Sequence, residues 1–170
     1  AATNYDVTTY VLENDAHCPA AHLCHHFTLG NIQDFDTVYN FGKQLDALTI
    51  EIEAVNVEAL EKLEQEGVKV YPTPAAIRII KNKILQKEFY QKNEIPTSEF
   101  HITLHQSDLL QHIAFLPAVH KLGEGGYDGK GVQVINSENE IELGFNAPAV
   151  LEKKVAIAKE IALIVGMNAE

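Results

Sequence analysis

Apolar residues in the first part of the chain alternate between strand-like and helix-like spacing. Three runs are rich in β-branched and aromatic residues, as strands typically are; they span residues 6–12, 47–53 and 68–71. Between them, apolar side chains recur at helical spacing after Asp34 and Asn56, which can cap helices. The two helices are expected to bury Phe35, Val38, Tyr39, Phe41 or Leu45, and Val57, Leu60 and Leu63. Strands separated by such helices predict right-handed crossovers and a doubly wound parallel sheet covered on both faces.

The second part of the chain follows a different pattern. A helical stretch from Pro74 to about Asn93 must end before Pro96, because proline disfavours helical geometry in the residue before it. We therefore place a domain boundary between residues 94 and 95. Beyond it, a helix capped by Ser107 and several short strands predict a small α+β unit. The strands are expected near residues 100–104, 118–121, 132–135, 149–152 and 160–165.

Composition narrows the class of protein. With 170 residues, 46% of them hydrophobic, the chain can bury a core, and its formal charge of −11 would repel a nucleic-acid backbone. No apolar run approaches the ~20 residues that cross a bilayer, and the first residues lack the features of a signal peptide. We therefore expect a cytoplasmic protein with no nucleic-acid or membrane partner and with Cys18 and Cys24 reduced. The abrupt start and end of the sequence favour a chain that is truncated on both sides.

A glycine-rich connection holds the clearest chemical signal. Lys121 ends a predicted strand, and five glycines follow within the nine residues 123–131, before the next strand. Glycine lets backbone N–H groups turn toward an anion and lysine adds a positive charge, so this segment can form a phosphate cradle. It is neither a P-loop nor a dinucleotide-binding fingerprint, because no Gly-Lys-Ser/Thr opens a helix and the glycine spacing differs. The alternative is a hairpin loop whose glycines serve only the turn.

The same segment resembles part of a known family. The run Gly125-Gly126-Tyr127-Asp128-Gly129-Lys130-Gly131 resembles the loop that 5-(carboxyamino)imidazole ribonucleotide synthases, members of the ATP-grasp superfamily, close over ATP and the imidazole nucleotide. Further similar segments follow in the family's order: residues 71–74, 78–80, 85–89, 95–97, 147–153 and 159–162. The resemblance implies a Rossmann-like pre-ATP-grasp α/β domain over residues 1–94, with a helical connection but without the family's first strand. It implies an α+β ATP-grasp subdomain over residues 95–170, without the catalytic half.

The resemblance also implies two sets of binding residues. For ATP, Lys83 and Lys121 would reach the phosphates beneath the glycine loop, and Glu160 would bind the ribose hydroxyls. The adenine edge would be held through backbone groups of Glu152, Lys153, Lys154 and Val155. The imidazole ribonucleotide would contact Tyr127, Asp128 and Lys130, with Glu51 and Glu53 nearby at a strand end. The chemistry agrees, because a carboxylate suits a diol and a lysine suits a phosphate.

The implied activity is the ATP-dependent carboxylation of 5-aminoimidazole ribonucleotide with bicarbonate, in purine biosynthesis. ADP and phosphate are released, and Mg²⁺ neutralises the phosphates; its ligands and the bicarbonate site would lie after Glu170. We therefore expect these 170 residues alone to be inactive. Family members commonly form homodimers. Asn82, Ala54 and Met167 depart from the family's usual residues, which leaves local substrate contacts open.

Other interpretations remain. The chain is compatible with another purine-pathway ATP-grasp ligase, or with a non-catalytic nucleotide-binding remnant. Glu51 and Glu53 fit a paired general acid and base, but they fit a solvated sheet end almost as well. A histidine and cysteine cluster lacks the spacing of zinc ligands, so we assign no metal to it. The cluster consists of His17, Cys18, His22, Cys24, His25 and His26.

Overall fold

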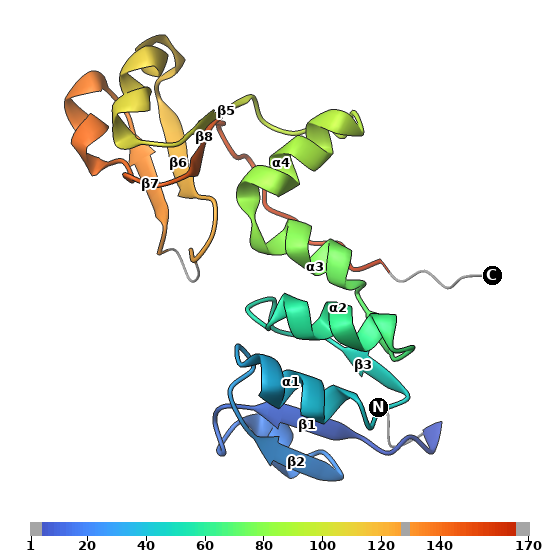
Figure 1. The fold of residues 1–170 in the computed structure, drawn as a ribbon. Helices are drawn as coiled ribbons and strands as arrows, with labels where there is room; N and C mark the ends of the chain where they lie inside the picture. Colours follow the sequence, from blue (N-terminus) through green and yellow to red (C-terminus); the bar gives the residue numbers. More distant parts are fainter. Residues whose placement is uncertain (1–4, 127–129, 166–170) are drawn as a thin grey trace. The chain divides into compact units, whose positions relative to one another are not determined.

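The computed structural model describes residues 5–126 and 130–165. Its contacts divide the chain into two compact units, Ala1–Gln86 and Lys87–Glu170. In Figure 1 the first unit runs from blue to green and the second from green to red. The division falls inside helix α4 (Lys83–Lys92), whereas the sequence prediction placed the boundary after this helix, between residues 94 and 95.

The first unit alternates short strands and helices. Its elements before α4 are β1 (Tyr10–Glu13), the 3-10 helix η2 (Pro19–His22), β2 (His26–Leu29), α1 (Phe35–Gly42), β3 (Ala47–Thr49), α2 (Val57–Gln65), β4 (Lys69–Tyr71) and α3 (Pro74–Lys81). Parallel pairing joins β1 to β2 and β3 to β4, which confirms the predicted parallel α/β class. Within residues 5–126 and 130–165 the two pairs are not hydrogen-bonded to each other, so they form two short ladders rather than one continuous sheet.

Local capping explains where the two buried helices begin. Asp34 Oδ2 accepts a hydrogen bond from Thr37 N at 2.8 Å, and Asn56 Oδ1 accepts one from Ala59 N at 2.8 Å, as predicted. The helices contribute Val38, Phe41, Val57, Leu60 and Leu63 to the core, together with Leu48 and Val70 from β3 and β4. The predicted burial of Phe35 is wrong. This side chain is 40% exposed in the first turn of α1, where it stacks on Tyr39.

Two predicted strands are shorter in the structure. The first begins at Tyr10 rather than near residue 6, because Asp6 has a φ of 55°, outside strand geometry. The strand predicted over residues 47–53 ends at Thr49. Glu51 and Glu53 therefore lie in exposed bends and turns after β3, and the prediction that they share one face of a strand is wrong. The chain turns here because Asn56 N must reach Ile32 O, at 2.8 Å, to start α2.

The long helix predicted from Pro74 to Asn93 is two helices. The chain leaves helical geometry at Asn82, with φ −116° and ψ 111°. Asn82 Oδ1 then accepts hydrogen bonds from Ile84 N at 2.9 Å and Leu85 N at 3.2 Å, so its side chain caps the start of α4. The break follows from this residue type, because asparagine favours helix N-termini over helix interiors.

The second unit is built on a four-stranded antiparallel sheet, which confirms the predicted α+β class. The strand order is β5-β8-β6-β7. After α4 come β5 (Phe100–Thr103), the 3-10 helix η3 (Gln106–Phe115), β6 (Ala118–Leu122), β7 (Val132–Ile135), the 3-10 helix η4 (Glu138–Leu143) and β8 (Ala149–Lys153). Ser107 is not the cap of η3. Asp108 Oδ2 instead accepts the backbone N–H groups of Leu104 at 2.8 Å and His105 at 2.9 Å.

Buried residues on both central strands hold this sheet together. The core consists of Leu109, Ala118, Ile135, Ile141 and Leu151. His120, fully buried on β6, accepts a hydrogen bond from Phe145 N at Nδ1 (3.1 Å), and its Nε2 lies 2.9 Å from Thr103 Oγ1. Burial lowers the pKa of His120, and a neutral imidazole with the proton on Nε2 satisfies both contacts.

The strand predicted at residues 160–165 is absent. These residues have no regular secondary structure, and their apolar side chains are exposed, Ile164 to 98%. The segment is apolar enough for a strand. No strand in residues 5–126 or 130–165 pairs with it, however, so its backbone has no ladder to join.

Candidate functional site

The glycine-rich segment connects two neighbouring antiparallel strands. Lys121 of β6 pairs with Val132 of β7, and Leu122 N donates to Gly131 O at 2.9 Å. Gly125 and Gly131 have φ values of 77° and 83°, which favour glycine. This confirms the predicted arrangement of a lysine at a strand end, a glycine-rich connection and a second strand. The same geometry is what a plain hairpin would need, so the phosphate cradle stays a prediction.

Three residues of the predicted loop site, Tyr127, Asp128 and Gly129, lie outside the described residues. The described flanks come close together. A Cβ added at Gly126 would lie 2.8 Å from Lys130 O, so any larger residue would force the two sides of the loop apart. Lys130 is exposed in the turn before β7.

Lys121 lies beside Glu152, another predicted site residue. Glu152 on β8 pairs with Val119 on β6, which places Lys121 diagonally across from it on the same face of the sheet. Lys121 Nζ lies 3.0 Å from Glu152 Oε2. Strand pairing therefore brings a cation at the mouth of the glycine loop together with the first residue of the predicted adenine segment.

Glu152 is shared by more than one cation. Lys87 Nζ lies 3.3 Å from Glu152 Oε1, and Ser98 Oγ donates to Glu152 Oε2 at 3.1 Å. Burial raises the pKa of Glu152, but the hydrogen bonds and charges of Lys121 and Lys87 outweigh it and leave the pKa below its ordinary value. Two ammonium groups against one ionised carboxylate leave one excess positive charge, which favours an anionic ligand.

The predicted adenine segment follows directly. Lys153 N donates to Glu99 O at 2.8 Å and Lys154 N donates to Pro117 O at 3.2 Å, so these two N–H groups already have partners. The side chains of both lysines are also engaged. Lys153 Nζ donates a hydrogen bond to Phe115 O at 2.7 Å, and Lys154 Nζ donates one to Asn136 Oδ1 at 3.3 Å. An adenine edge would have to use other backbone groups, such as those of Val155, which is 58% exposed.

The other predicted site residues lie away from this cluster in the chain. Lys83 is the first residue of α4 and belongs to the first unit, as do Glu51 and Glu53. Glu160 is exposed after β8. The ion pair between Lys121 and Glu152 brings two of the predicted site residues together.

Sequence reasoning missed Lys87 and its hydroxyl partners. Lys87 Nζ donates to Thr97 Oγ1 at 2.5 Å and to Ser98 Oγ at 3.2 Å, and it lies 5.6 Å from the centre of the Phe100 ring. A signal existed in the sequence, because Lys87 is three residues from both Ile84 and Tyr90 and so shares a helix face with them. A lysine among apolar positions is a candidate for a buried cation.

The described residues contain neither a cluster of metal ligands nor a membrane-spanning helix. Within residues 5–126 and 130–165, no group of three histidine, cysteine or acidic side chains lies close enough to hold a metal ion. Across the same residues, no helix has the length and apolar character that a membrane span requires.

Comparison with known proteins assigns both parts of the chain. Residues 1–81 match the ribonucleotide synthetase preATP-grasp domain, and residues 88–170 match the ATP-grasp domain. Together the two domain models cover almost the whole chain. The two matched domains follow in the order expected from the sequence, and the fold class is confirmed.

Comparison with named proteins indicates which group of enzymes the chain is similar to. The chain is 34% identical to chloroplastic phosphoribosylaminoimidazole carboxylase of Vigna aconitifolia, over 97% of the chain and 31% of the relative. It is 30% identical to N5-carboxyaminoimidazole ribonucleotide synthase of Synechococcus elongatus, over 99% of the chain and 44% of the relative. The chain therefore spans less than half the length of these relatives, which are the group that the glycine loop resembles.

Solved structures of similar fold come from the same group of enzymes. The carboxyaminoimidazole ribonucleotide synthase of Aspergillus clavatus in complex with ATP superposes with a TM-score of 0.82 and 29% identity, over 92% of this chain and 43% of that one. A second structure of the Aspergillus clavatus enzyme, with ADP and 5-aminoimidazole ribonucleotide, gives a TM-score of 0.78 and 27% identity. Between them, the two structures hold the two ligand classes that the sequence predicted for the glycine loop, an adenine nucleotide and 5-aminoimidazole ribonucleotide.

Proposed function

We propose that this chain supplies part of the ATP and ribonucleotide site of an N5-carboxyaminoimidazole ribonucleotide synthase. That enzyme would carboxylate 5-aminoimidazole ribonucleotide with bicarbonate and ATP, releasing ADP and phosphate, in purine biosynthesis. The relative from Synechococcus elongatus, which matches 99% of the chain, bears this name, and a solved relative holds both ADP and the ribonucleotide.

One observation supports the ATP part of the proposal most strongly. Lys121 stands at the mouth of the glycine hairpin, with 30% of its side chain exposed, in a cluster that has one more positive than negative charge. A triphosphate would accept a charge-assisted hydrogen bond from Lys121 and further hydrogen bonds from the loop N–H groups. We assign Lys121 and residues 125–131 to the phosphates and Glu152 to Val155 to the adenine.

The remaining assignments rest on the family resemblance. Lys83 would reach the phosphates and Glu160 the ribose, while Tyr127, Asp128 and Lys130 would contact the ribonucleotide, with Glu51 and Glu53 near it. Among the described residues no three histidine, cysteine or acidic side chains meet, and Glu152 is engaged by two lysines, so we still place the Mg²⁺ ligands outside this chain. A homodimer, a cytoplasmic location and the use of bicarbonate stay predictions.

An ATP titration of this 170-residue chain, followed by amide NMR, tests the proposal. We expect shifts at residues 121–126, 130–131 and 152–155, with β1 and β2 unmoved as an internal reference. Unmoved amides at the loop would overturn the ATP site. An assay for bicarbonate-dependent ADP release separates catalysis from binding, and we expect none from these residues alone. Release of ADP by this chain would contradict that expectation.

A further inference from the structure

Lys87 is a buried cation to which the proposed function gives no task. Its side chain is 7% exposed, although a lysine is almost never buried unless its charge is paired. It lies 3.3 Å from Glu152 Oε1 and donates to the Thr97 and Ser98 hydroxyls. Burying a lysine costs free energy that an apolar residue would avoid, which favours a role that requires the charge.

The two lysines at Glu152 differ in how tightly they are held. Lys87 has hydroxyl and aromatic neighbours around its ammonium group, whereas 30% of the Lys121 side chain is open to solvent. They also contact different oxygens of Glu152: Lys87 lies beside Oε1, and Lys121 lies beside Oε2. Lys121 can therefore leave the carboxylate without disturbing the contact that Lys87 makes.

We propose that Lys87 is a positioning residue that keeps Glu152 ionised and in place while Lys121 moves from this carboxylate to a bound phosphate. The inference rests on the proposed function, because it needs a phosphate as the second partner of Lys121. Without Lys87, the departure of Lys121 would leave a carboxylate, 14% exposed, with no cation beside it. Lys121 would then stay on Glu152, and phosphate binding would be weaker.

Ser98 provides a second link between Lys87 and the Glu152 carboxylate. It accepts from Lys87 Nζ at 3.2 Å and donates to Glu152 Oε2 at 3.1 Å, so it links the buried cation to the oxygen that Lys121 would release. Glu152 also begins the adenine segment. Lys87 would thereby keep the adenine end of the site fixed while its phosphate end exchanges partners.

The first test follows the Glu152 carboxyl carbon by NMR during a pH titration. The groups that face this carboxylate are Lys87 from α4, Lys121 from β6 and Ser98 before β5, with Phe100 opposite on β5. In Lys121→Met, which imitates the departed lysine, we expect Glu152 to titrate still below its ordinary value of 4.5. A Glu152 that titrates above that value in Lys121→Met would overturn the proposal. Addition of Lys87→Met to this variant should raise the midpoint.

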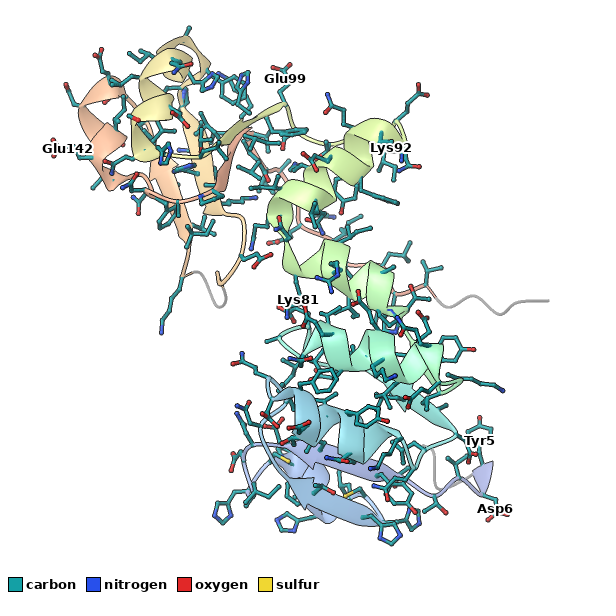
Figure 2. All side chains as sticks on the ribbon, in the orientation of Figure 1. Tyr5, Asp6, Lys81, Lys92, Glu99 and Glu142 are labelled. Atoms are coloured by element: carbon teal, nitrogen blue, oxygen red, sulfur yellow. The ribbon has the colours of Figure 1, made fainter. Side chains whose placement is uncertain are left out.

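The second test is ADP affinity measured by calorimetry. We expect Lys87→Met to weaken ADP binding at least about tenfold, as removal of one partner of a buried charge pair does, and Lys87→Arg to restore most of it. Lys92→Met is the matched control, because Lys92 is an exposed lysine at the C-terminal end of the same helix, α4 (Figure 2). Equal affinity in Lys87→Met and wild type would overturn the positioning role. If wild type itself fails to bind ADP, the proposed function fails, and the carboxyl titration still decides whether Lys87 holds Glu152.

Discussion

The two units use charge in opposite ways. In the first unit, Arg78 pairs with Glu58 and Glu61 on the helix surface, and all three side chains are at least 37% exposed. In the second unit, Lys87 and Lys121 share Glu152, and the exposed fractions of these side chains are 7%, 30% and 14%. Surface pairs stabilise a fold weakly, whereas buried charges carry a desolvation cost. This difference is why we propose a ligand-binding role for the buried cluster and none for the surface cluster.

Replacement of Glu152 should give the largest effect. Glu152→Gln keeps the shape of the side chain but leaves two lysines without their carboxylate. We expect the second unit to lose about 3 kcal/mol in free energy of unfolding, the cost of breaking a buried ion pair. Urea denaturation, followed by amide signals of β6 and β8, measures this.

Glu142→Gln provides the matched control. Glu142 belongs to the same unit and is an exposed carboxylate at the outer surface of η4 (Figure 2). We expect little change there, because neither burial nor a described ion pair involves its side chain. Equal destabilisation by the two substitutions would show that the buried cluster is no different from surface charge.

Acidification should weaken the second unit through the same carboxylate. The folded pKa of Glu152 lies below its ordinary value of 4.5, so its stabilising contribution is complete above that value and is lost as the pH falls through the folded pKa. We expect the stability gap between wild type and Glu152→Gln to shrink between neutral and strongly acidic pH. Denaturant midpoints across that range measure it, and a gap that is independent of pH would contradict the assignment.

The surface pairs should give the smallest effect. Arg78→Gln removes the exposed ion pairs with Glu58 and Glu61, and we expect a loss of about 0.5 kcal/mol or less in free energy of unfolding. Added salt should reduce even that, because exposed charges are screened. A loss comparable to that of Glu152→Gln, measured in the same denaturation experiment on β3 and β4 amides, would remove the contrast between the units.

Local signals in the sequence predicted much of the fold. Asp34 and Asn56 were identified as caps because capping depends on residues three positions apart. The antiparallel connection around Gly125 and Gly131 was also predictable from the spacing of strands and glycines. The absence of a strand at residues 160–165 was not predictable, because a strand exists only where another strand pairs with it, and apolar composition does not reveal whether that partner is there.

The candidate site also has residues that the sequence predicted and one that it did not. Lys121 and Glu152 were predicted because the family resemblance covers both, and strand register then placed them in contact. Lys87 was missed, because its burial depends on Ser98 and Glu152, which are 54 residues apart in the sequence. Contacts over such separations follow from the sheet topology rather than from any local pattern.

The central claim is that Lys121 at the glycine hairpin binds the phosphates of a nucleotide. Its most direct test compares the ATP affinities of wild type, Lys121→Gln and the exposed control Lys92→Gln by calorimetry. We predict that Lys121→Gln loses about tenfold or more in affinity, as expected for one charge-assisted hydrogen bond, while Lys92→Gln matches wild type. An ATP affinity that is the same in all three proteins would contradict the account.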